Sequence, residues 1–197
     1  MIHHLGVCPL CRRTSLLAYE ICFDCLATLI REESLFAYCH HVCETCGAPL
    51  LHRDSVCAHD RIPALYRYRG KIRELLFAYE ELGTVRLATT IAHLLSSEIE
   101  RLCATFGNIA LVPFPSSVKS NWRYGSDPME LIASKCVRKP KIDVLQLYGT
   151  SHRSRHDFDA LLVVGDVVHS DSCIDASVEL LKQRFHMPVR ALCVAMD

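Results

Sequence analysis

The spacing of the cysteines constrains the fold of this chain more than any other feature of its sequence. Two sets of residues share the spacing C-x2-C-x10-C-x2-C, thirty-five residues apart: Cys8, Cys11, Cys22 and Cys25 in the first set, and Cys43, Cys46, Cys57 and Asp60 in the second. The last position of the second set holds an aspartate instead of a cysteine. Self-similarity at a fixed offset indicates an internal repeat, so both halves are predicted to fold as the same small unit.

Facing Cys-x2-Cys turns are typical of zinc ribbons. Each turn brings two thiolates to one ion at a Zn–S distance of about 2.3 Å, and two turns complete a tetrahedral site with no open position. A closed site of this kind stabilises a fold and does not catalyse a reaction. Because each half is too short to bury a core, zinc would supply most of its folding free energy. We expect two Zn²⁺ ions, held in a double ribbon over residues 1–62.

The fourth ligand of the second site has more than one candidate. Asp60 fits the repeat, and zinc accepts a carboxylate oxygen at about 2.0–2.2 Å. His59 lies one residue earlier and His52 lies nearby, and a zinc site of three cysteines and a histidine is more usual than one of three cysteines and an aspartate. A second half that has lost its metal is the third alternative.

Composition limits where the chain works and what it binds. Its 22 lysines and arginines balance 22 aspartates and glutamates, so no overall charge attracts nucleic acid or an anionic membrane. No apolar run approaches the roughly 18 residues of a membrane span, and the first residues lack the pattern of a signal peptide. We therefore expect a cytoplasmic protein, in which clustered cysteines are metal ligands and not disulfides.

After the cysteine repeats, strand and helix patterns alternate along residues 63–197. Short apolar runs predict strands at residues 109–115, 142–148, 160–168 and 189–196. Helical spacing of apolar residues predicts helices near residues 72–83, 88–102, 127–137 and 174–185. The alternation predicts a doubly wound α/β domain whose mainly parallel sheet is covered on both faces.

A basic stretch joins the two parts of the chain. Residues 61–73, RIPALYRYRGKIR, hold five basic residues and no acidic one. With Tyr66 and Tyr68 as stacking platforms, this composition suits contact with a single strand of nucleic acid. The alternative is a β-strand whose arginines face the solvent.

A second basic stretch covers residues 135–155. The candidate nucleic-acid contacts of the two stretches together are Arg67, Tyr68, Arg69, Lys71, Arg73, Lys139, Lys141, Arg153 and Arg155. Basic residues near helix ends also occur simply because they are solvated or complement the helix dipole.

The order of motifs resembles the ComF family of competence proteins. The motifs are the two Cys-x2-Cys ribbons, Tyr-x-Tyr-x-Gly at 66–70, Val-Pro-x-Pro at 112–115 and Leu-Leu-Val-Val-x-Asp-Val-Val at 161–168. Members join a double zinc ribbon to a phosphoribosyltransferase-like domain, here residues 1–62 and 63–197. The resemblance implies a role in uptake or processing of single-stranded DNA beside a helicase-like partner.

The ligand loop departs from the family pattern, which at the late strand is Asp-Asp-Val-x-Thr-Thr-Gly-x-Thr. There the acidic pair holds the ribose hydroxyls of phosphoribosyl pyrophosphate and the loop cradles its phosphate. The corresponding residues here are Gly165, Asp166, Ser170, Asp171 and Ser172. The family's Arg-Gly-Phe-Asn-Gln segment keeps only its glycine, Gly125.

Asp171 is the most consequential of these changes, because it puts a carboxylate at the glycine position that faces an anion. At about 4 Å and an effective dielectric near 20, such a repulsion is of order 4 kcal/mol. Asp171 or Ser172 would instead cap the following helix. We expect a phosphoribosyltransferase fold without catalytic residues; the alternatives are an enzyme with residual phosphoribosyl pyrophosphate or nucleotide binding, and a protein-docking module.

Overall fold

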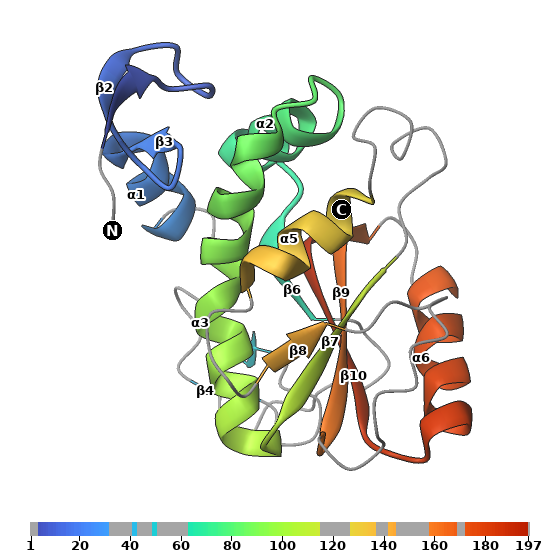
Figure 1. Ribbon diagram of the computed structural model, residues 1–197. Coiled ribbons are helices and arrows are strands. Elements are labelled where there is room, and N and C mark those ends of the chain that lie inside the picture. Colours follow the sequence, from blue (N-terminus) through green and yellow to red (C-terminus); the bar gives the residue numbers. More distant parts are fainter. Residues whose placement is uncertain are drawn as a thin grey trace.

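The computed structural model describes residues 4–31, 41–42, 49–50, 63–114, 127–136, 142–144, 158–168 and 172–196. They form an N-terminal ribbon with antiparallel strands and an α/β unit built on a five-stranded sheet (Figure 1). Of the helices in these ranges, none combines the length and the apolarity that a membrane span requires.

The first ribbon is a small antiparallel sheet followed by one helix. Its elements are β1 (His4–Val7), β2 (Thr14–Ala18), β3 (Ile21–Cys22) and α1 (Phe23–Arg31). A tight turn between β2 and β3 places Tyr19 and Glu20 in the left-handed region, at φ of 52° and 74°. The turn lets β3 pair directly with β2, which brings Cys22 back toward the start of the ribbon.

A second hairpin repeats the first one. Strands β4 (His41–Val42) and β5 (Pro49–Leu50) pair antiparallel, with His41 opposite Leu50 and Val42 opposite Pro49. In the first hairpin, Gly6 lies opposite Ser15 and Val7 opposite Thr14. Every position of the second pairing is therefore the first one shifted by thirty-five residues, the same offset as in the cysteine repeat.

The five strands of the α/β unit are all parallel and lie in the order β6-β10-β9-β7-β8. Their bounds are β6 (Ala64–Arg67), β7 (Ile109–Pro113), β8 (Ile142–Val144), β9 (Ala160–Val168) and β10 (Val189–Met196). The strands β7, β9 and β10 consist almost wholly of apolar residues because both faces of the sheet are covered. The predicted parallel sheet is confirmed.

Helices cover both faces of this sheet (Figure 1). They are α2 (Gly70–Glu80), the short 3₁₀ helix η1 (Val85–Leu87), α3 (Ala88–Phe106), α5 (Pro128–Cys136) and α6 (Ser172–Phe185). The side chains of β9 alternate between the faces: Leu162 and Val164 pack with α2, α3 and α5, whereas Leu161 and Val163 pack with α6. As the sequence predicted, α5 begins with a cap, since Asp127 Oδ1 accepts the N–H of Met129 at 2.8 Å.

The first ribbon packs against α2 and α3 and does not stand alone. Leu17, Ile21 and Leu29 belong to the same buried cluster as the inner faces of α2 and α3. The Tyr19 ring stacks on His93 of α3 with centroids 3.6 Å apart, and Thr90 donates a hydrogen bond to the Tyr19 carbonyl. The first half therefore has a buried core only together with α2 and α3, in keeping with the prediction that it is too short to bury one by itself.

Candidate functional site

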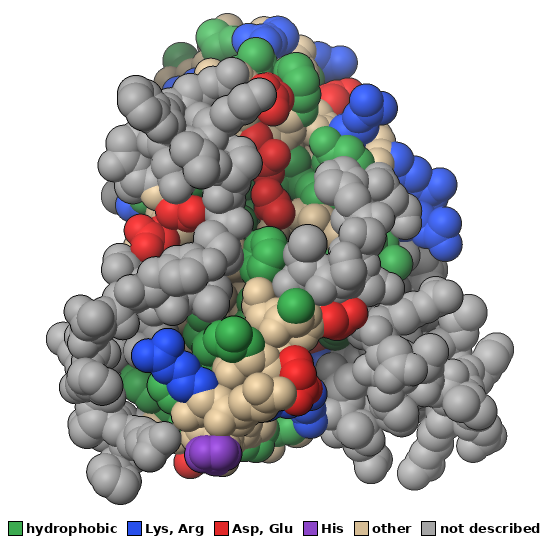
Figure 2. Space-filling view, turned by 90° about the vertical axis from the view of Figure 1, so that its right-hand side faces the viewer, with side chains coloured by type: hydrophobic (Ala, Val, Ile, Leu, Met, Phe, Trp, Pro, Cys, Tyr) green, Lys and Arg blue, Asp and Glu red, His purple; other side chains and the backbone are tan. Residues whose placement is uncertain are grey.

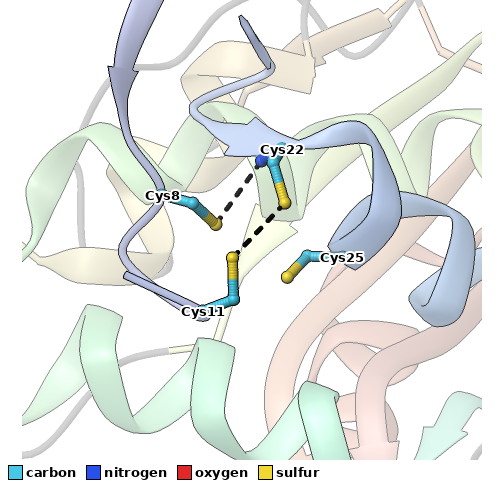
Figure 3. Close-up of side chains that lie close together, drawn as sticks. All are labelled: Cys8, Cys11, Cys22 and Cys25. Carbon is cyan, nitrogen blue, oxygen red and sulfur yellow. Dashed lines mark hydrogen bonds between the residues drawn. The ribbon is translucent and has the colours of Figure 1, made fainter. Parts of the chain in front are cut away.

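Four cysteine sulfurs of the first ribbon meet in one place (Figure 3). Cys8 follows β1, Cys11 lies in the turn after it, Cys22 ends β3, and Cys25 lies in the first turn of α1. All four sulfurs lie within 4.8 Å of one another, and the Cys11 and Cys22 sulfurs are 3.6 Å apart. The structure thus brings together the four residues of the first predicted site.

The turn around Cys8 shapes one side of this cluster. The Cys8 N–H donates to the Arg13 carbonyl at 2.9 Å, and the Arg12 N–H donates to the Cys8 carbonyl at 2.9 Å. The Cys22 N–H points at the Cys8 sulfur, 3.4 Å away. Burial acts to raise the pKa of Cys8, but backbone hydrogen bonds from Cys11, Cys22 and Leu10 outweigh it and lower the pKa to about 7.

The sulfurs of Cys22 and Cys25 are harder to ionise without a cation. Burial is the main cause that raises the pKa of Cys22 and of Cys25, and neighbouring sulfurs add to the rise at Cys25. Four thiolates in so small a volume repel one another, so they need a positive ion to be ionised together. Metal binding here must therefore release protons.

The geometry fits a metal ion. Tetrahedral coordination at a Zn–S distance of about 2.3 Å separates the sulfurs by about 3.8 Å, close to the Cys11–Cys22 distance of 3.6 Å. A tetrahedral set of four thiolates suits zinc or an iron–sulfur centre, and it leaves no position for a substrate. The cluster is a candidate structural metal site.

The residues of the second predicted site lie outside the described residues. They are Cys43, Cys46, Cys57 and Asp60, with His52 and His59 as alternative ligands. What the structure does describe is the hairpin that leads to Cys43, in the register of the first ribbon. The second site stays a prediction.

At the carboxyl end of β9, Gly165 is enclosed on the face covered by α6. A Cβ atom at Gly165 would lie 2.9 Å from the Cys193 sulfur and 3.3 Å from Ile174 Cδ1. Real Cβ atoms essentially never come that close to a neighbour, so something would have to shift. Glycine at this position is explained by packing between β9, β10 and α6.

Asp166 points to the opposite face, where it meets Glu80 of α2. Its Oδ1 accepts the N–H of Val167 at 2.7 Å. Burial raises the pKa of Glu80 to about 9, and the charge of Asp166, a hydrogen bond to it and the charge of Glu81 add to the rise. At neutral pH Glu80 is therefore a carboxylic acid that is hydrogen-bonded to Asp166.

The sequence reasoning missed this carboxyl pair. Glu80 lies four residues after Leu76 and eight after Ile72, both of which are fully buried. Its place on the buried face of the helix was therefore visible from helical spacing. Its partner was not, because Asp166 is remote in the chain.

Replacement of Glu80 by Gln is expected to stabilise the protein at alkaline pH. The unfolded chain loses the Glu80 proton near pH 4.5, whereas the folded state keeps it up to about pH 9. The contribution of Glu80 to the free energy of unfolding is thus highest below pH 4.5 and falls as the pH rises toward 9. We expect Glu80→Gln to remove this loss and to raise the free energy of unfolding by about 2 kcal/mol at pH 8, but little at pH 5.

Chemical denaturation at pH 5 and pH 8 measures this effect. Glu179→Gln, at an exposed position of α6 away from the pair, is the matched control and should change stability little at either pH. If Glu80→Gln raised the free energy of unfolding equally at both pH values, Glu80 would not be protonated in the folded protein at neutral pH.

The basic stretch at 61–73 forms the end of β6 and the start of α2. Tyr66 is only 4% exposed and lies in the core, so it is not available for stacking on a base, and Tyr68 is partly buried against the same core. Arg67, Arg69 and Arg73 are exposed.

Other predicted contacts are not placed by the structure. Lys139, Lys141, Arg153, Arg155, Ser170 and Asp171 lie outside the described residues, and Ser172 is the first residue of α6. On the face that Figure 2 shows, acidic side chains lie between separate groups of lysines and arginines. The described part of this face therefore has no continuous basic surface.

Together these features define a mixed α/β protein with a ribbon near its N-terminal end whose four clustered cysteines could hold a metal ion. No family model matches the chain, and no curated protein matches it.

Proposed function

We propose that this chain is a ComF-like factor that assists the uptake or processing of single-stranded DNA in transformation, as a zinc-braced scaffold without catalytic activity. The proposal starts from the order of ribbon, strand and loop motifs in the sequence. The observation that carries its non-catalytic part is the packing around Gly165.

Gly165 occupies the position of the first acid in the family's sugar-binding pair. Its missing side chain would meet Cys193 and Ile174, so no carboxylate fits there without repacking. The remaining acid, Asp166, already accepts a hydrogen bond from the Val167 N–H and is hydrogen-bonded to Glu80. Both facts support the loss of the ribose contacts that transfer chemistry requires.

Isothermal titration with phosphoribosyl pyrophosphate and magnesium tests this part of the proposal. We expect no heat of binding beyond dilution. Binding in the micromolar range would contradict it and would favour the alternative of an enzyme with residual phosphoribosyl pyrophosphate or nucleotide binding.

We infer that the metal is zinc and that each ribbon half binds one ion. Four thiolates at tetrahedral separation support the first ion. The repeated hairpin register supports a second ion in the second half. Elemental analysis of untagged protein tests both statements: two zinc ions per chain are expected, and one would leave Asp60 without a role as ligand.

Contact with DNA is proposed at the exposed arginines between β6 and α2. Arg67, Arg69 and Arg73 lie within seven residues and face the solvent. Because contact with phosphates releases counterions, binding of a single-stranded oligonucleotide should weaken steeply between 50 and 200 mM salt. Replacing the three arginines by glutamine should weaken binding at low salt and reduce the slope of log K against log salt by about 2.

A gel-shift titration at several salt concentrations measures this slope. The control is the pair Lys182→Gln and Arg184→Gln on α6, which covers the other face of the sheet. Binding that ignores salt, or that depends equally on the α6 pair, would contradict the proposed contact.

One observation favours a docking module as the second candidate. The outer face of the ribbon sheet presents Leu5, 72% exposed, directly opposite Leu16, 54% exposed. Val7, 50% exposed, lies two residues after Leu5 on β1 and therefore on the same face of the strand. A helicase-like partner would cover these side chains. Its co-purification should be lost in Leu5→Ser/Leu16→Ser and kept in Leu180→Ser, a control at an equally exposed leucine of α6.

A further inference from the structure

The turn between β2 and β3 holds two residues in an unusual conformation. Tyr19 and Glu20 alone form the loop of this hairpin, and their φ angles are 52° and 74°. Two-residue loops with positive φ at both positions normally hold asparagine, aspartate or glycine, because larger side chains are strained there. The thirty-five-residue offset puts Asp54 and Ser55 at the corresponding positions of the second half, and Asp54 fits this preference. The tyrosine of the first half therefore needs a reason outside the turn.

Contacts with the start of α3 supply this reason. The Tyr19 ring stacks on His93, with centroids 3.6 Å apart and ring planes 10° apart. The hydroxyl of Thr90, which is fully buried, donates a hydrogen bond to the Tyr19 carbonyl. Glu20 Oε2 also lies 4.0 Å from Nε of Arg86, in η1. Strained backbone persists where its surroundings fix it, so these contacts hold the turn in its conformation.

The same turn determines where Cys22 lies. Cys22 ends β3, three residues after Tyr19, and is paired with Leu17 across the hairpin. Its N–H points at the Cys8 sulfur, 3.4 Å away, and its own sulfur lies 3.6 Å from that of Cys11. Because a two-residue loop fixes the register of the strands that it joins, a change in the turn would move Cys22 relative to Cys8 and Cys11.

We propose that Tyr19 is a positioning residue of the metal centre. Through Thr90 and His93, the α/β unit holds the β2–β3 turn so that Cys22 faces the other three cysteines before the metal binds. Metal affinity then depends on this contact, and by reciprocity the bound metal strengthens the docking of the ribbon on α3. The inference rests on the metal-binding ribbon of the proposed function, and not on DNA binding or on the loss of phosphoribosyl pyrophosphate binding.

Cobalt titration of the full chain tests the proposal. Co²⁺ in a tetrahedral four-thiolate site has characteristic visible and charge-transfer absorption, and a competing chelator of known affinity gives the dissociation constant. A background chain with Cys43→Ser and Cys46→Ser lacks two predicted ligands of the second site, so that the absorption reports the first cluster. In this background we expect Thr90→Val to weaken Co²⁺ binding about tenfold, as loss of a group that orients ligands does, while the spectrum keeps its tetrahedral form.

Substitutions of Tyr19 separate the contact with α3 from the strain of the turn. Tyr19→Phe keeps the stacked ring and should retain the affinity within about twofold. Tyr19→Gly removes the strain but also the stack, and should weaken Co²⁺ binding about tenfold. An unchanged or higher affinity in Tyr19→Gly would show that the turn does not depend on α3 and would overturn the proposal.

Thr105→Val is the matched control for Thr90→Val. Thr105 is an exposed threonine of α3, and its hydroxyl donates within the helix, to the Arg101 carbonyl. The affinity of this variant should equal that of the background chain. No loss in Thr90→Val, or equal losses in Thr90→Val and Thr105→Val, would contradict the role of the contact with Tyr19.

Hydrogen exchange of the background chain covers the case in which the variants fold poorly. Addition of Co²⁺ should slow amide exchange about tenfold in residues 86–94, where the ribbon docks, and far less in residues 174–185 of α6. Equal exchange with and without the metal would overturn the coupling. A background chain without tetrahedral thiolate bands would overturn the metal centre itself, whereas the tests with DNA and with phosphoribosyl pyrophosphate would be unaffected.

Discussion

Removal of a metal ion held by the four clustered cysteines is expected to unfold the first ribbon and to destabilise the α/β unit with it. Structural zinc contributes an apparent 10–16 kcal/mol or so in isolated zinc modules. Here the ribbon shares its buried cluster with α2 and α3, so part of the core survives only while the ribbon is folded. When free metal is present at about a thousand times the dissociation constant, binding adds about 4 kcal/mol to the free energy of unfolding. Removing the metal should therefore lower Tm by roughly 10 °C.

Chelator treatment and Cys25→Ser should produce this effect alike, measured as Tm by circular dichroism and as protease sensitivity of the ribbon. Cys25 is buried in α1 and belongs to the four-sulfur cluster. Cys103→Ser is the control, because Cys103 lies on α3 outside the cluster. A chelated protein that melts at the temperature of the untreated one would show that the cluster does not brace the fold.

Adding a side chain at Gly165 is expected to destabilise the protein strongly. For Gly165→Ala, the new Cβ would meet the Cys193 sulfur at 2.9 Å, and Cys193 is fully buried and short, so it cannot move aside. Overpacking of this kind costs about 1–3 kcal/mol. Gly165→Asp adds the burial of a carboxylate and should cost several kcal/mol more, without gaining phosphoribosyl pyrophosphate binding.

A double-mutant cycle with Cys193→Ala isolates the contact. Removing the sulfur makes room for the new Cβ, so the cost of Gly165→Ala should shrink by about 1–2 kcal/mol in the Cys193→Ala background. Ile174 Cδ1, at 3.3 Å, is the end of a flexible side chain and should adjust in either background. If the changes in the free energy of unfolding of the two single substitutions simply add in the double variant, Gly165 is not enclosed by Cys193.

The local features of this protein were accessible from its sequence. The cysteine spacing predicted the four-sulfur cluster, because two residues between cysteines suffice to form the turn that aims both sulfurs at one point. The thirty-five-residue offset predicted an internal repeat, and the two hairpins pair in registers that differ by the same offset. The Asp127 cap and the strand β9 could also be predicted from the sequence, since each depends on neighbours within a few residues.

Contacts between remote residues were decided only by the tertiary structure. The sequence suggested Tyr66 as an exposed stacking platform, but both faces of the sheet are covered, so Tyr66 is buried. Glu80 and Asp166 form a pair only because the packing of α2 on the sheet brings these remote residues together.

Sequence by itself therefore determined the repeated metal-ligand pattern, the alternation of strands and helices and their parallel sheet. The tertiary structure alone decided that the ribbon shares a core with the α/β unit, and which charged groups are buried there. The physical reason is range: turns, caps and periodicity depend on residues close along the chain, whereas burial and pairing depend on which distant surfaces pack together.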